Sequence, residues 1–359
     1  KYTDELIRMA HDMDDKPPKR EMDMLFTIGE QMSVSLMAMV MHKLGVPAVS
    51  LNAFQVTMHT TSSHQNARLK RIDTERIRRE LDARRIVIVT GFQGVDKYDD
   101  YTTLGRGGSD TTAVALAAAL HADACEIYTD VDGVYTADPR KVPNARKLKE
   151  ITYDEMLDLA TSGAGVLHNR SVEMAKKYGV PLVVRSSLNN SEGTVVKEVV
   201  SVERMLISGV ALDTDAVRIA VLGLRDVPGV AFKVFDTLAK KNINVDVILQ
   251  SIGRAGTKDI SFTVNKDDLE DAVATLEEHQ ERLGFKELHS ERNIAKLSIV
   301  GSGMLSNPGV AAKMFESLYN EGVNINMIST SEIRITVLIN EKDGIRAMNA
   351  VHDAFGLAD

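Results

Sequence analysis

The sequence has no tryptophan, one cysteine and only 5% aromatic residues among its 359 residues. A single cysteine, Cys125, excludes an intramolecular disulfide, which fits a reducing compartment. Because Cys125 lies in an apolar stretch, we expect it to be a small, buried packing residue. Residues 1–15 lack the apolar stretch of a signal peptide, and nowhere do 18 apolar residues run together. The sequence therefore predicts no membrane span and a cytoplasmic location.

The charge balance is acidic, with 43 Lys and Arg residues against 51 Asp and Glu residues and a formal net charge of -8. No cluster of basic residues stands out, although binding to nucleic-acid phosphates requires one. The composition therefore argues against a nucleic-acid partner. A hydrophobic content of 44% and a charged content of 26% are typical of a globular protein. The length predicts two or three domains.

The first half of the chain alternates between helical and strand patterns. Helices are expected at residues 22–44, 73–83, 111–121, 153–161 and 171–178, and strands at 46–54, 85–90, 124–129 and 181–185. This alternation predicts an α/β domain with a mainly parallel sheet, whose ligands bind beyond the carboxyl ends of the strands. The loops expected at that edge are 91–94, 105–110 and 129–140. The methionines of the first helix are expected to fill the core: Met32, Met37, Met39 and Met41.

The second half of the chain contains an internal repeat. Pro-Gly-Val-Ala occurs at 228–231 and again at 308–311, about eighty residues later. Similar asparagine-containing segments follow at 243–245 and 323–325. Each copy predicts the order strand, Pro-Gly turn, helix, strand, strand, helix, which is ferredoxin-like. Because the spacing is too long for a solenoid unit, we expect a tandem pair of domains.

The most informative stretch is residues 102–112, Thr-Thr-Leu-Gly-Arg-Gly-Gly-Ser-Asp-Thr-Thr. Its three glycines allow the backbone to approach a ligand and to turn N–H groups toward an anion. The helix that follows adds the positive end of its dipole. Arg106 supplies a planar fork that is suited to a carboxylate. The structural alternative is that Ser109 and Asp110 simply cap the helix.

A second polar cluster lies within residues 129–140. Tyr135 is suited to cover an aromatic ring such as adenine. Arg140 and the threonines Thr129 and Thr136 are suited to reach phosphate oxygens. The alternative interpretation is a turn that a glycine and a proline make rigid.

Glu30 is an acidic residue within the apolar helical stretch 22–44. A buried carboxylate needs a partner, and the ammonium group of a substrate would supply one. The alternative is a helix position that faces the solvent. The sequence alone leaves both interpretations of Glu30 open.

Taken together, these blocks resemble the aspartate kinase family of the amino-acid kinase superfamily. The resemblance is carried by residues 102–112, by 128–140, by Phe92 in its glycine turn and by 328–334, Ile-Ser-Thr-Ser-Glu-Ile-Arg. The repeats resemble the tandem ACT domains of that family. The chain is most similar to the shorter, monofunctional type, since no homoserine dehydrogenase domain follows the repeats.

The resemblance implies both a fold and an activity. The fold is an amino-acid-kinase α/β/α sandwich over residues 1–200, followed by ferredoxin-like (βαββαβ) ACT domains at 201–292 and 293–359. The activity is transfer of the ATP γ-phosphoryl group to the side-chain carboxylate of L-aspartate, giving 4-phospho-L-aspartate. Since this nucleophile is already ionised, catalysis consists of positioning and charge neutralisation, with Mg²⁺ bridging the nucleotide phosphates. No protein side chain is identified as a metal ligand.

The resemblance also implies roles for individual residues. Arg106 pairs with the α-carboxylate of aspartate, and Glu30 and Asp110 face its ammonium group. The other residues of the substrate pocket are Phe92, Gly107, Gly108 and Ser109. The nucleotide-binding positions are Thr129, Asp130, Tyr135, Asp138 and Arg140.

Lysine and threonine are the feedback inhibitors that the resemblance implies, acting at the ACT domains. The effector positions are Asp226, Gly229, Ala231, Asp246 and Gln250 in the first copy, and Asn324, Ile325 and Ser331 in the second. A free amino acid suits a Pro-Gly loop leading into a helix N-terminus, because its carboxylate meets unpaired N–H groups there. The sequence leaves open whether lysine acts alone or together with threonine. Edge strands of ferredoxin-like domains usually pair, which predicts a homodimer.

Two features depart from the family pattern. The family opens with a strand and a Lys-Phe/Tyr-Gly-Gly loop, and nothing in this sequence matches them. We expect the given sequence to omit its beginning, because a parallel sheet without its first strand would expose an edge and apolar faces. Gly165 stands where many relatives carry a phosphate-facing lysine, and His168 nearby is expected to be structural rather than a base.

Two alternatives to an aspartate kinase follow from these observations. The unmatched opening loop and Gly165 suit a catalytically silent regulatory subunit that binds amino acids. A kinase of the same superfamily acting on glutamate, acetylglutamate or a nucleotide is the other alternative. Relatives of that kind commonly lack paired ACT repeats, so the Pro-Gly pairs of this chain argue against it.

Overall fold

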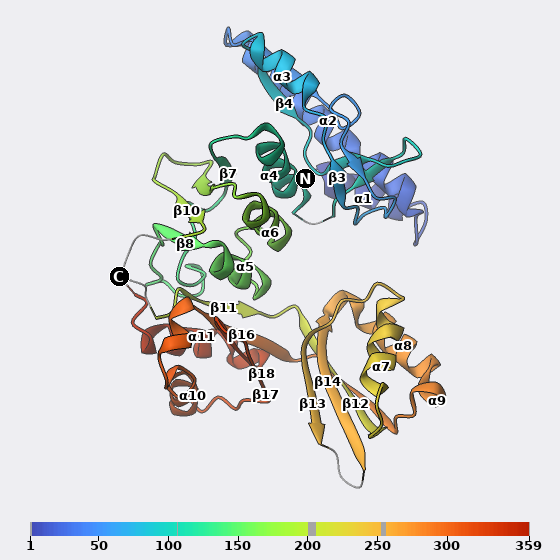
Figure 1. Cartoon of the computed structure of the whole chain (residues 1–359), viewed down its shortest axis with the longest axis vertical. Helices are drawn as coiled ribbons and strands as arrows, with labels where there is room; N and C mark the ends of the chain where they lie inside the picture. Colours follow the sequence, from blue (N-terminus) through green and yellow to red (C-terminus); the bar gives the residue numbers. More distant parts are fainter. Residues whose placement is uncertain (1, 106, 200–205, 253–255, 359) are drawn as a thin grey trace. The chain divides into compact units, whose positions relative to one another are not determined.

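The computed structural model describes every residue except 1, 106, 200–205, 253–255 and 359. The chain divides into two compact units (Figure 1). Unit 1 comprises residues 1–134, 149–157 and 165–200. Unit 2 comprises residues 135–148, 158–164 and 201–359. Each unit has its own core and is described by itself.

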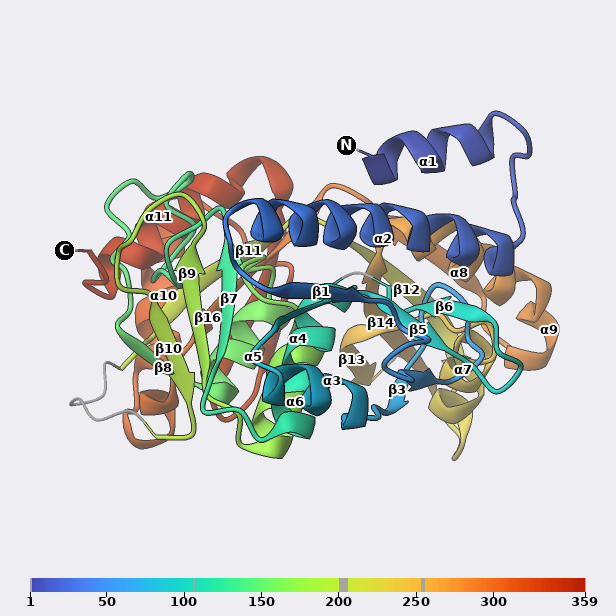
Figure 2. The ribbon, with the colours of Figure 1, turned by 90° about the horizontal axis from the view of Figure 1, so that it is seen from above.

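Unit 1 opens with two helices and a pair of parallel strands. The elements are α1 (Tyr2–His11), α2 (Lys19–Lys43), β1 (Ala48–Leu51), α3 (Glu75–Asp82) and β4 (Ile86–Val89). Strands β1 and β4 pair in parallel, and α2 lies along them, as Figure 2 shows. The core beneath these elements includes Leu51, Val56, Met58 and Ile77. The helices and strands predicted here are therefore present, with shorter strands than expected.

The outer face of α2 corrects one expectation from the sequence. Met32, Met37 and Met39 do not fill the core; they are exposed, Met39 to 65%. By length and composition, α2 is also long and apolar enough to cross a membrane, although the sequence contains no unbroken run of 18 apolar residues. A helix that packs on a sheet in a globular domain can have the same length and composition, and α2 contacts β1, β4 and β6.

A second sheet of unit 1 carries the strands that lead into the glycine-rich loop. Its members are β2 (His59–Thr60), β3 (Leu69–Arg71), β5 (Gln93–Val95) and β6 (Tyr101–Thr103). The strand order is β3-β2-β5-β6, and β6 also contacts α2. The loop therefore begins at a strand that is held both by its sheet and by α2.

The third sheet of unit 1 follows the glycine-rich loop. Its strands are β7 (Cys125–Thr129), β8 (Glu150–Thr152), β9 (Leu182–Ser186) and β10 (Thr194–Lys197), and the accompanying helices are α4 (Gly108–Leu120), α5 (Tyr153–Thr161) and α6 (Asn169–Tyr178). The order is β7-β9-β10-β8, with β7 parallel to β9, β8 parallel to β10, and β9 antiparallel to β10. Helix α4 packs against α6 and β7, and Cys125 is buried as expected. The mainly parallel α/β fold is confirmed.

The first repeat, in unit 2, is a complete ferredoxin-like fold. It consists of β12 (Ala216–Arg225), α7 (Val230–Ala239), β13 (Asp246–Ile252), β14 (Thr257–Asn265), α8 (Leu269–Glu278), α9 (Gln280–Leu283) and β15 (Glu287–Glu291). All pairs are antiparallel in the order β13-β14-β12-β15. Gly229 of the Pro-Gly turn has φ 88°, a left-handed conformation that glycine adopts without strain, and α7 begins at the next residue.

The second repeat borrows its fourth strand from before the first repeat. It contains β16 (Ile294–Val300), α10 (Val310–Asn320), β17 (Met327–Thr330), β18 (Arg334–Asn340) and α11 (Gly344–Ala354). Strand β11 (Gly209–Asp213) completes the order β11-β16-β18-β17, in the place that β15 takes in the first repeat. The first repeat is thus inserted between two paired strands of the second. The predicted domain boundaries at 200/201 and 292/293 stay predictions.

Candidate active site

The glycine-rich loop is folded so tightly that its glycines have no room for side chains. Gly105 and Gly107 have φ 77° and 65°, in the left-handed region. A Cβ at Gly105 would lie 2.8 Å from the backbone oxygen of Gln65, and one at Gly107 would overlap the ring of His168. Arg106, between them, lies outside the described residues. The loop is therefore shaped by contact with neighbouring segments.

Phe92 is the strained residue of this site. Its φ is 69°, which is rare for an aromatic residue and marks a position that its surroundings impose. The Phe92 N–H donates to Thr112 Oγ1 at 3.1 Å, and the Phe92 carbonyl accepts from Leu104 N at 2.9 Å. A Cβ at Gly108 would lie 2.7 Å from Phe92 Cδ2. The structure thus brings Phe92 against the glycine-rich loop, as predicted.

Helix α2 contributes Glu30 to the same unit. One helical turn before it, the Thr27 carbonyl accepts a 2.9 Å hydrogen bond from Gln93 Nε2, which ties α2 to the Phe92 turn. Glu30 is half-buried, and burial raises the pKa of its carboxyl group. Among the described residues Glu30 has no ion-pair partner. A cation brought by a ligand would relieve this desolvation.

Ser109 and Asp110 lie in the first turn of α4, beside the Phe92 turn. Ser109 is exposed, and its Oγ would lie 3.0 Å from a Cβ placed at Gly91. Asp110 is half-buried; burial raises the pKa of its carboxyl group, and a hydrogen bond from the His168 backbone partly opposes that rise. Unit 1 therefore brings Phe92, Ser109 and Asp110 to the glycine-rich loop and the start of α4, and helix α2 of the same unit carries Glu30.

His168 has the structural role expected from the sequence. Its Nδ1 accepts a 3.3 Å hydrogen bond from Arg170 N and so caps the start of α6. Burial lowers the pKa of the His168 imidazole. The Arg170 guanidinium in turn donates to the carbonyls of Leu104 and Ala67, at 2.6 and 2.9 Å. These residues hold the loop in place.

Two of the residues predicted to bind the nucleotide, Thr129 and Asp130, lie in unit 1 at the carboxyl end of β7. The Thr129 carbonyl accepts hydrogen bonds from Ser187 N at 2.8 Å and Ser187 Oγ at 3.0 Å. Thr129 Oγ1 donates to Asp130 Oδ1 at 3.1 Å, and Asp130 is exposed. The half-buried Thr129 and the exposed Asp130 thus lie at the edge where a parallel sheet is expected to bind its ligand.

The other residues predicted to bind the nucleotide, Tyr135, Asp138 and Arg140, lie in unit 2. Tyr135 forms an isolated antiparallel bridge with Lys147. Arg140 donates to both carboxylate oxygens of Asp138, from Nε at 3.0 Å and Nη2 at 3.1 Å. This guanidinium holds the pKa of Asp138 below its usual range. Asp138 therefore orients Arg140, whose side chain is otherwise exposed.

Thr136 corrects the sequence interpretation of this cluster. It was expected to reach phosphate oxygens, but it is fully buried. Its hydroxyl donates to the Leu357 carbonyl at 3.1 Å and accepts from Arg146 N at 2.9 Å. His352 Nε2 lies 2.9 Å from the same oxygen. The hydroxyl is fully used inside unit 2 and does not face a ligand.

The effector residues predicted in the first repeat lie on the Pro-Gly turn and on β13. Asp226 forms a 2.8 Å ion pair with Lys258, Gly229 is exposed at the turn, and Ala231 packs against the core of the repeat. Gln250 is exposed on β13. The turn and the strand thus present polar groups, while Ala231 contributes packing.

Asp246 lies at the start of β13 and pairs with a buried lysine of the second repeat. Lys296 Nζ lies 2.9 Å from Asp246 Oδ2 and 2.9 Å from Asp213 Oδ2. Burial alone would raise the pKa of Asp246, but the ammonium group of Lys296 brings it below its usual range. Asp246 is therefore already partly neutralised by its own chain.

In the second repeat the predicted effector residues follow α10 and β17. Asn324 is exposed, whereas Ile325 packs against the core of the repeat. Ser331 is exposed, and its N–H donates to the Arg334 carbonyl at 2.8 Å. Asn324 and Ser331 are thus accessible to a ligand, while Ile325 has a packing role.

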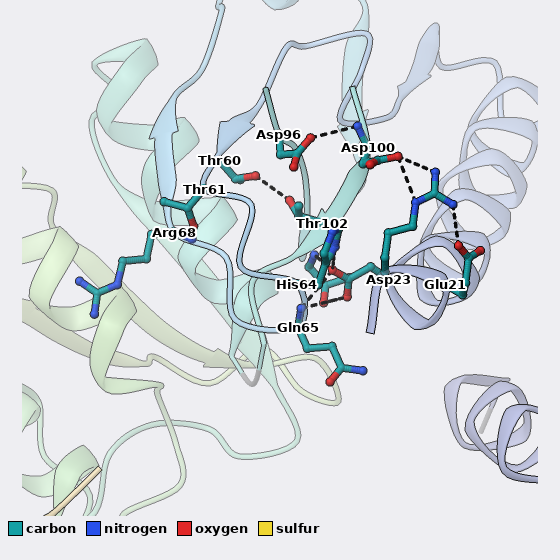
Figure 3. A network of polar contacts seen from close by, with 12 residues as sticks. Glu21, Asp23, Thr60, Thr61, His64, Gln65, Arg68, Asp96, Asp100 and Thr102 are labelled. Carbon is teal, nitrogen blue, oxygen red and sulfur yellow. Dashed lines mark hydrogen bonds and ion pairs between the residues drawn. The ribbon is translucent and has the colours of Figure 1, made fainter. Parts of the chain in front are cut away.

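Asp23, which was not among the residues predicted from the sequence, is the centre of a polar network near the glycine-rich loop (Figure 3). Asp23 lies on α2 and is fully buried. Its carboxylate accepts from the Gln65 N–H, from the Thr103 N–H at 3.1 Å and from Thr103 Oγ1 at 2.6 Å. His64 Nδ1 lies 2.9 Å from Asp23 Oδ2. Asp23 thereby joins α2 to β6, two residues before the glycine-rich loop.

The signal for Asp23 was present in the sequence. Like Glu30, it is an acidic residue within the apolar stretch 22–44. A carboxylate that is buried there needs a hydrogen-bond or ion-pair partner. Its partners are 41, 42 and 80 residues away in the chain, so only the fold identifies them.

Replacing Asp23 with alanine is expected to destabilise unit 1. Asp23→Ala leaves the buried N–H and hydroxyl of Thr103 and the part-buried N–H of Gln65 without an acceptor. The expected loss is about 3 kcal/mol in the free energy of unfolding. Urea titration of the parent and the variant measures it. Asp82→Ala, an exposed acid of α3, is the matched control and should change stability by less than about 0.5 kcal/mol. Equal stabilities for the Asp23 variant and its parent would refute the role assigned to this carboxylate.

The chain matches two family models. The model of the amino acid kinase family covers residues 1–186, and an ACT domain model covers residues 219–280 and 297–355. The first match spans more than half of the chain and includes the glycine-rich loop. The second match falls on the two ferredoxin-like repeats.

Curated relatives and solved structures agree with these models. An aspartokinase of Bacillus sp. (strain MGA3) is 50% identical over 359 residues, which is 100% of this chain and 87% of that relative. Aspartokinase 2 of Bacillus subtilis is also 50% identical, over 100% of this chain and 88% of its own length. Escherichia coli aspartokinase III in complex with aspartate and ADP gives a TM-score of 0.85 at 28% identity, covering 98% of this chain and 79% of that chain. The same enzyme with lysine and aspartate gives a TM-score of 0.73 at 29% identity, covering 94% and 76%.

Proposed function

Since the chain belongs to the aspartokinase family, we propose that it transfers the γ-phosphoryl group of ATP to the side-chain carboxylate of L-aspartate, giving 4-phospho-L-aspartate. The observation that carries this proposal is the glycine-rich loop folded against the strained Phe92. Such a loop, at the start of α4, offers backbone N–H groups to an anionic substrate. The E. coli relative, whose complex contains aspartate and ADP, supports the same pair of ligands.

We assign recognition of aspartate to residues of unit 1. Arg106 pairs with the α-carboxylate, since its planar fork is suited to two parallel hydrogen bonds. Glu30 and Asp110 face the ammonium group. Their burial supports this role, because a desolvated carboxylate is stabilised by a cation. Phe92 and Ser109 complete the pocket, and the reacting side-chain carboxylate points toward the nucleotide.

The reaction needs no general base, because the attacking carboxylate is ionised at neutral pH. One carboxylate oxygen attacks the γ-phosphorus in line, and ADP leaves with the bridging oxygen. The work of the protein is therefore to align the two substrates and to offset charge as the γ-phosphoryl group is transferred. A clamp of fixed side chains and backbone N–H groups serves that purpose.

We assign the nucleotide to Thr129, Asp130, Tyr135, Asp138 and Arg140. Arg140, oriented by Asp138, is suited to phosphate oxygens, and Tyr135 to the adenine ring. No group of three or more His, Cys, Asp or Glu side chains occurs among the described residues, so Mg²⁺ would be held chiefly by the nucleotide phosphates. Asp130, exposed beside Thr129, is the carboxylate suited to one of its waters. When bound, Mg²⁺ supplies neutralisation of phosphate charge.

A coupled assay that follows ADP release tests the proposal. The protein, purified from its complete coding sequence, is expected to consume ATP when L-aspartate and Mg²⁺ are present, and glutamate should be a much poorer acceptor. No aspartate-dependent consumption would favour a silent regulatory subunit. A clear preference for glutamate, acetylglutamate or a nucleotide would favour another kinase of the superfamily.

We further propose that lysine, alone or with threonine, inhibits the enzyme at the ACT repeats. The support is the E. coli relative with lysine bound in its T-state and the accessible polar residues at the Pro-Gly turn, on β13 and after β17. The effector positions proposed are Asp226, Gly229, Ala231, Asp246, Gln250, Asn324, Ile325 and Ser331. We also propose a homodimer through edge strands of the repeats and a cytoplasmic location.

Ser331→Phe is expected to blunt feedback inhibition while sparing uninhibited turnover. Ser331 is exposed beside β17, so a bulky ring there blocks a ligand without entering the core. The lysine concentration that gives half-inhibition should rise about tenfold or more, because that factor corresponds to the loss of one polar contact. Glu277→Phe, at an exposed position of helix α8 in the first repeat, is the matched control. A Ser331 variant that lysine inhibits as strongly as the parent would exclude this site.

A further inference from the structure

Residues 135–148, which include the predicted nucleotide positions Tyr135, Asp138 and Arg140, are built into the second ACT repeat. This segment belongs to unit 2 although it lies far from the repeats in sequence. Ala137, Val142 and Ala145 join the apolar core that contains Met348 and Val351 of α11. The Thr136 carbonyl accepts a 2.7 Å hydrogen bond from Val210 N on β11. The segment is therefore held by the regulatory repeat itself.

Polar contacts to α11 and the residues after it add to this packing. Asn349 Nδ2 donates to the Lys141 carbonyl at 3.0 Å, and Asn144 Nδ2 donates to Asp353 Oδ1 at 3.2 Å. Ala145 forms an isolated bridge with Ala358. Two of these three contacts are made by α11 and the third by a residue that follows it, so α11 and the residues after it support the segment.

Helix α11 also makes a buried contact with the segment, between His352 and Thr136. Both side chains are fully buried, and His352 Nε2 lies 2.9 Å from Thr136 Oγ1. The threonine hydroxyl has one hydrogen, which it donates to the Leu357 carbonyl, so it accepts from Arg146 N and from the imidazole. His352 Nε2 therefore carries a proton. Burial lowers the pKa of His352 and favours the neutral imidazole, with that proton on Nε2.

The other ring nitrogen shows that packing alone does not explain His352. Its Nδ1 is buried without a hydrogen-bond partner among the described residues, and Asp353 Oδ1 is 3.7 Å away. An unpaired buried polar atom costs free energy, and an aliphatic side chain would fill the same space without that cost. The feature of the imidazole that a leucine cannot supply is the Nε2–H donor to Thr136.

We propose that His352 is a positioning residue for the nucleotide side of the active site. By fixing Thr136 it holds the neighbouring Tyr135 and, two residues further on, the Asp138–Arg140 pair. The inference rests on the proposed function, because it takes these residues to bind ATP. It places support for the nucleotide on α11, a helix of the repeat that is proposed to sense the effector.

Steady-state kinetics of His352→Leu and His352→Gln test the proposal. The leucine variant should raise KM for ATP about five- to tenfold, the worth of one buried hydrogen bond, and leave KM for aspartate within about twofold. The glutamine variant should restore the parent value, because its Nε2 can donate as the imidazole Nε2 does. His11→Leu, an exposed histidine at the end of α1, is the matched control and should change neither constant.

Any of three results would overturn the positioning role. They are equal rises in both Michaelis constants, no rise in KM for ATP, or a glutamine variant as impaired as the leucine variant. If His352→Leu does not fold, Thr136→Val removes the same bond together with the bonds of the hydroxyl to Leu357 and Arg146, and should give at least the same selective rise in KM for ATP.

A parent protein without aspartate-dependent ATP consumption would reject the proposed function instead. Amide hydrogen exchange over residues 135–148 then decides the inference without any activity. Faster exchange in the leucine variant than in the glutamine variant would support the inference, and equal rates would refute it.

Discussion

Arg106→Ala is expected to raise KM for aspartate about a hundredfold while leaving KM for ATP within about twofold. The guanidinium is proposed to hold the α-carboxylate through two charge-assisted hydrogen bonds, and the ATP phosphates are assigned to other residues. The expected factor follows from losing about 3 kcal/mol of such bonds, at about 1.4 kcal/mol per tenfold change. Steady-state kinetics with each substrate varied in turn measure both constants.

Two further variants test whether the effect of Arg106→Ala is specific to the aspartate carboxylate. Arg79→Ala removes an exposed arginine of α3 and should alter neither constant. Arg106→Lys keeps the charge but loses the fork, and it should fall between the parent and the alanine variant. Equal rises in both Michaelis constants for Arg106→Ala would contradict a role confined to the aspartate carboxylate.

Gly107→Ala is expected to lower kcat/KM for aspartate by about a hundredfold or more. The added methyl group would overlap the ring of His168, and the left-handed φ of 65° adds strain. The loop must move to relieve both, and a displacement of about 1 Å in a positioning group costs about a hundredfold in rate. Kinetics at saturating ATP measure this loss, and thermal unfolding shows whether the variant is folded.

Gly179→Ala shows the effect of left-handed backbone strain without the steric overlap that a methyl group causes at Gly107. Gly179 ends α6 with φ 64°, close to the value at Gly107, but a Cβ there would meet no atom within 4 Å. This control should lose about 1 kcal/mol of stability and keep its kinetic constants. If Gly107→Ala behaves like Gly179→Ala, the close packing of the loop against His168 does not matter for aspartate.

Local patterns predicted much of this protein. The helical run in residues 22–44 became α2, the Pro-Gly repeats became α7 and α10 with their sheets, and residues 102–112 became β6, a glycine-rich loop and α4. These features depend on periodicity and on glycine at left-handed positions, which neighbouring residues reveal. The family resemblance carried the activity and the residue roles, and the family is confirmed by the models and relatives that match.

Other features depended on partners far away in the chain. The insertion of the first repeat between β11 and β16 was not visible, because both repeats show the same local order of elements. The exposed methionines of α2 were expected inside, since composition does not tell which face of an apolar helix is covered. Thr136 looked like a phosphate ligand because its neighbours resemble a nucleotide cluster.

The sequence by itself determined the types of elements, the paired repeats and the glycine-rich loop that is proposed to bind the substrate. Only the tertiary structure decided that Asp23 joins α2 to β6, that His352 holds Thr136, and that Lys296 neutralises Asp246. The physical reason is that backbone conformation follows from residues a few positions apart, whereas a buried charge or hydroxyl is satisfied by whichever group the fold brings to it. Here those groups come from 80, 216 and 50 residues away.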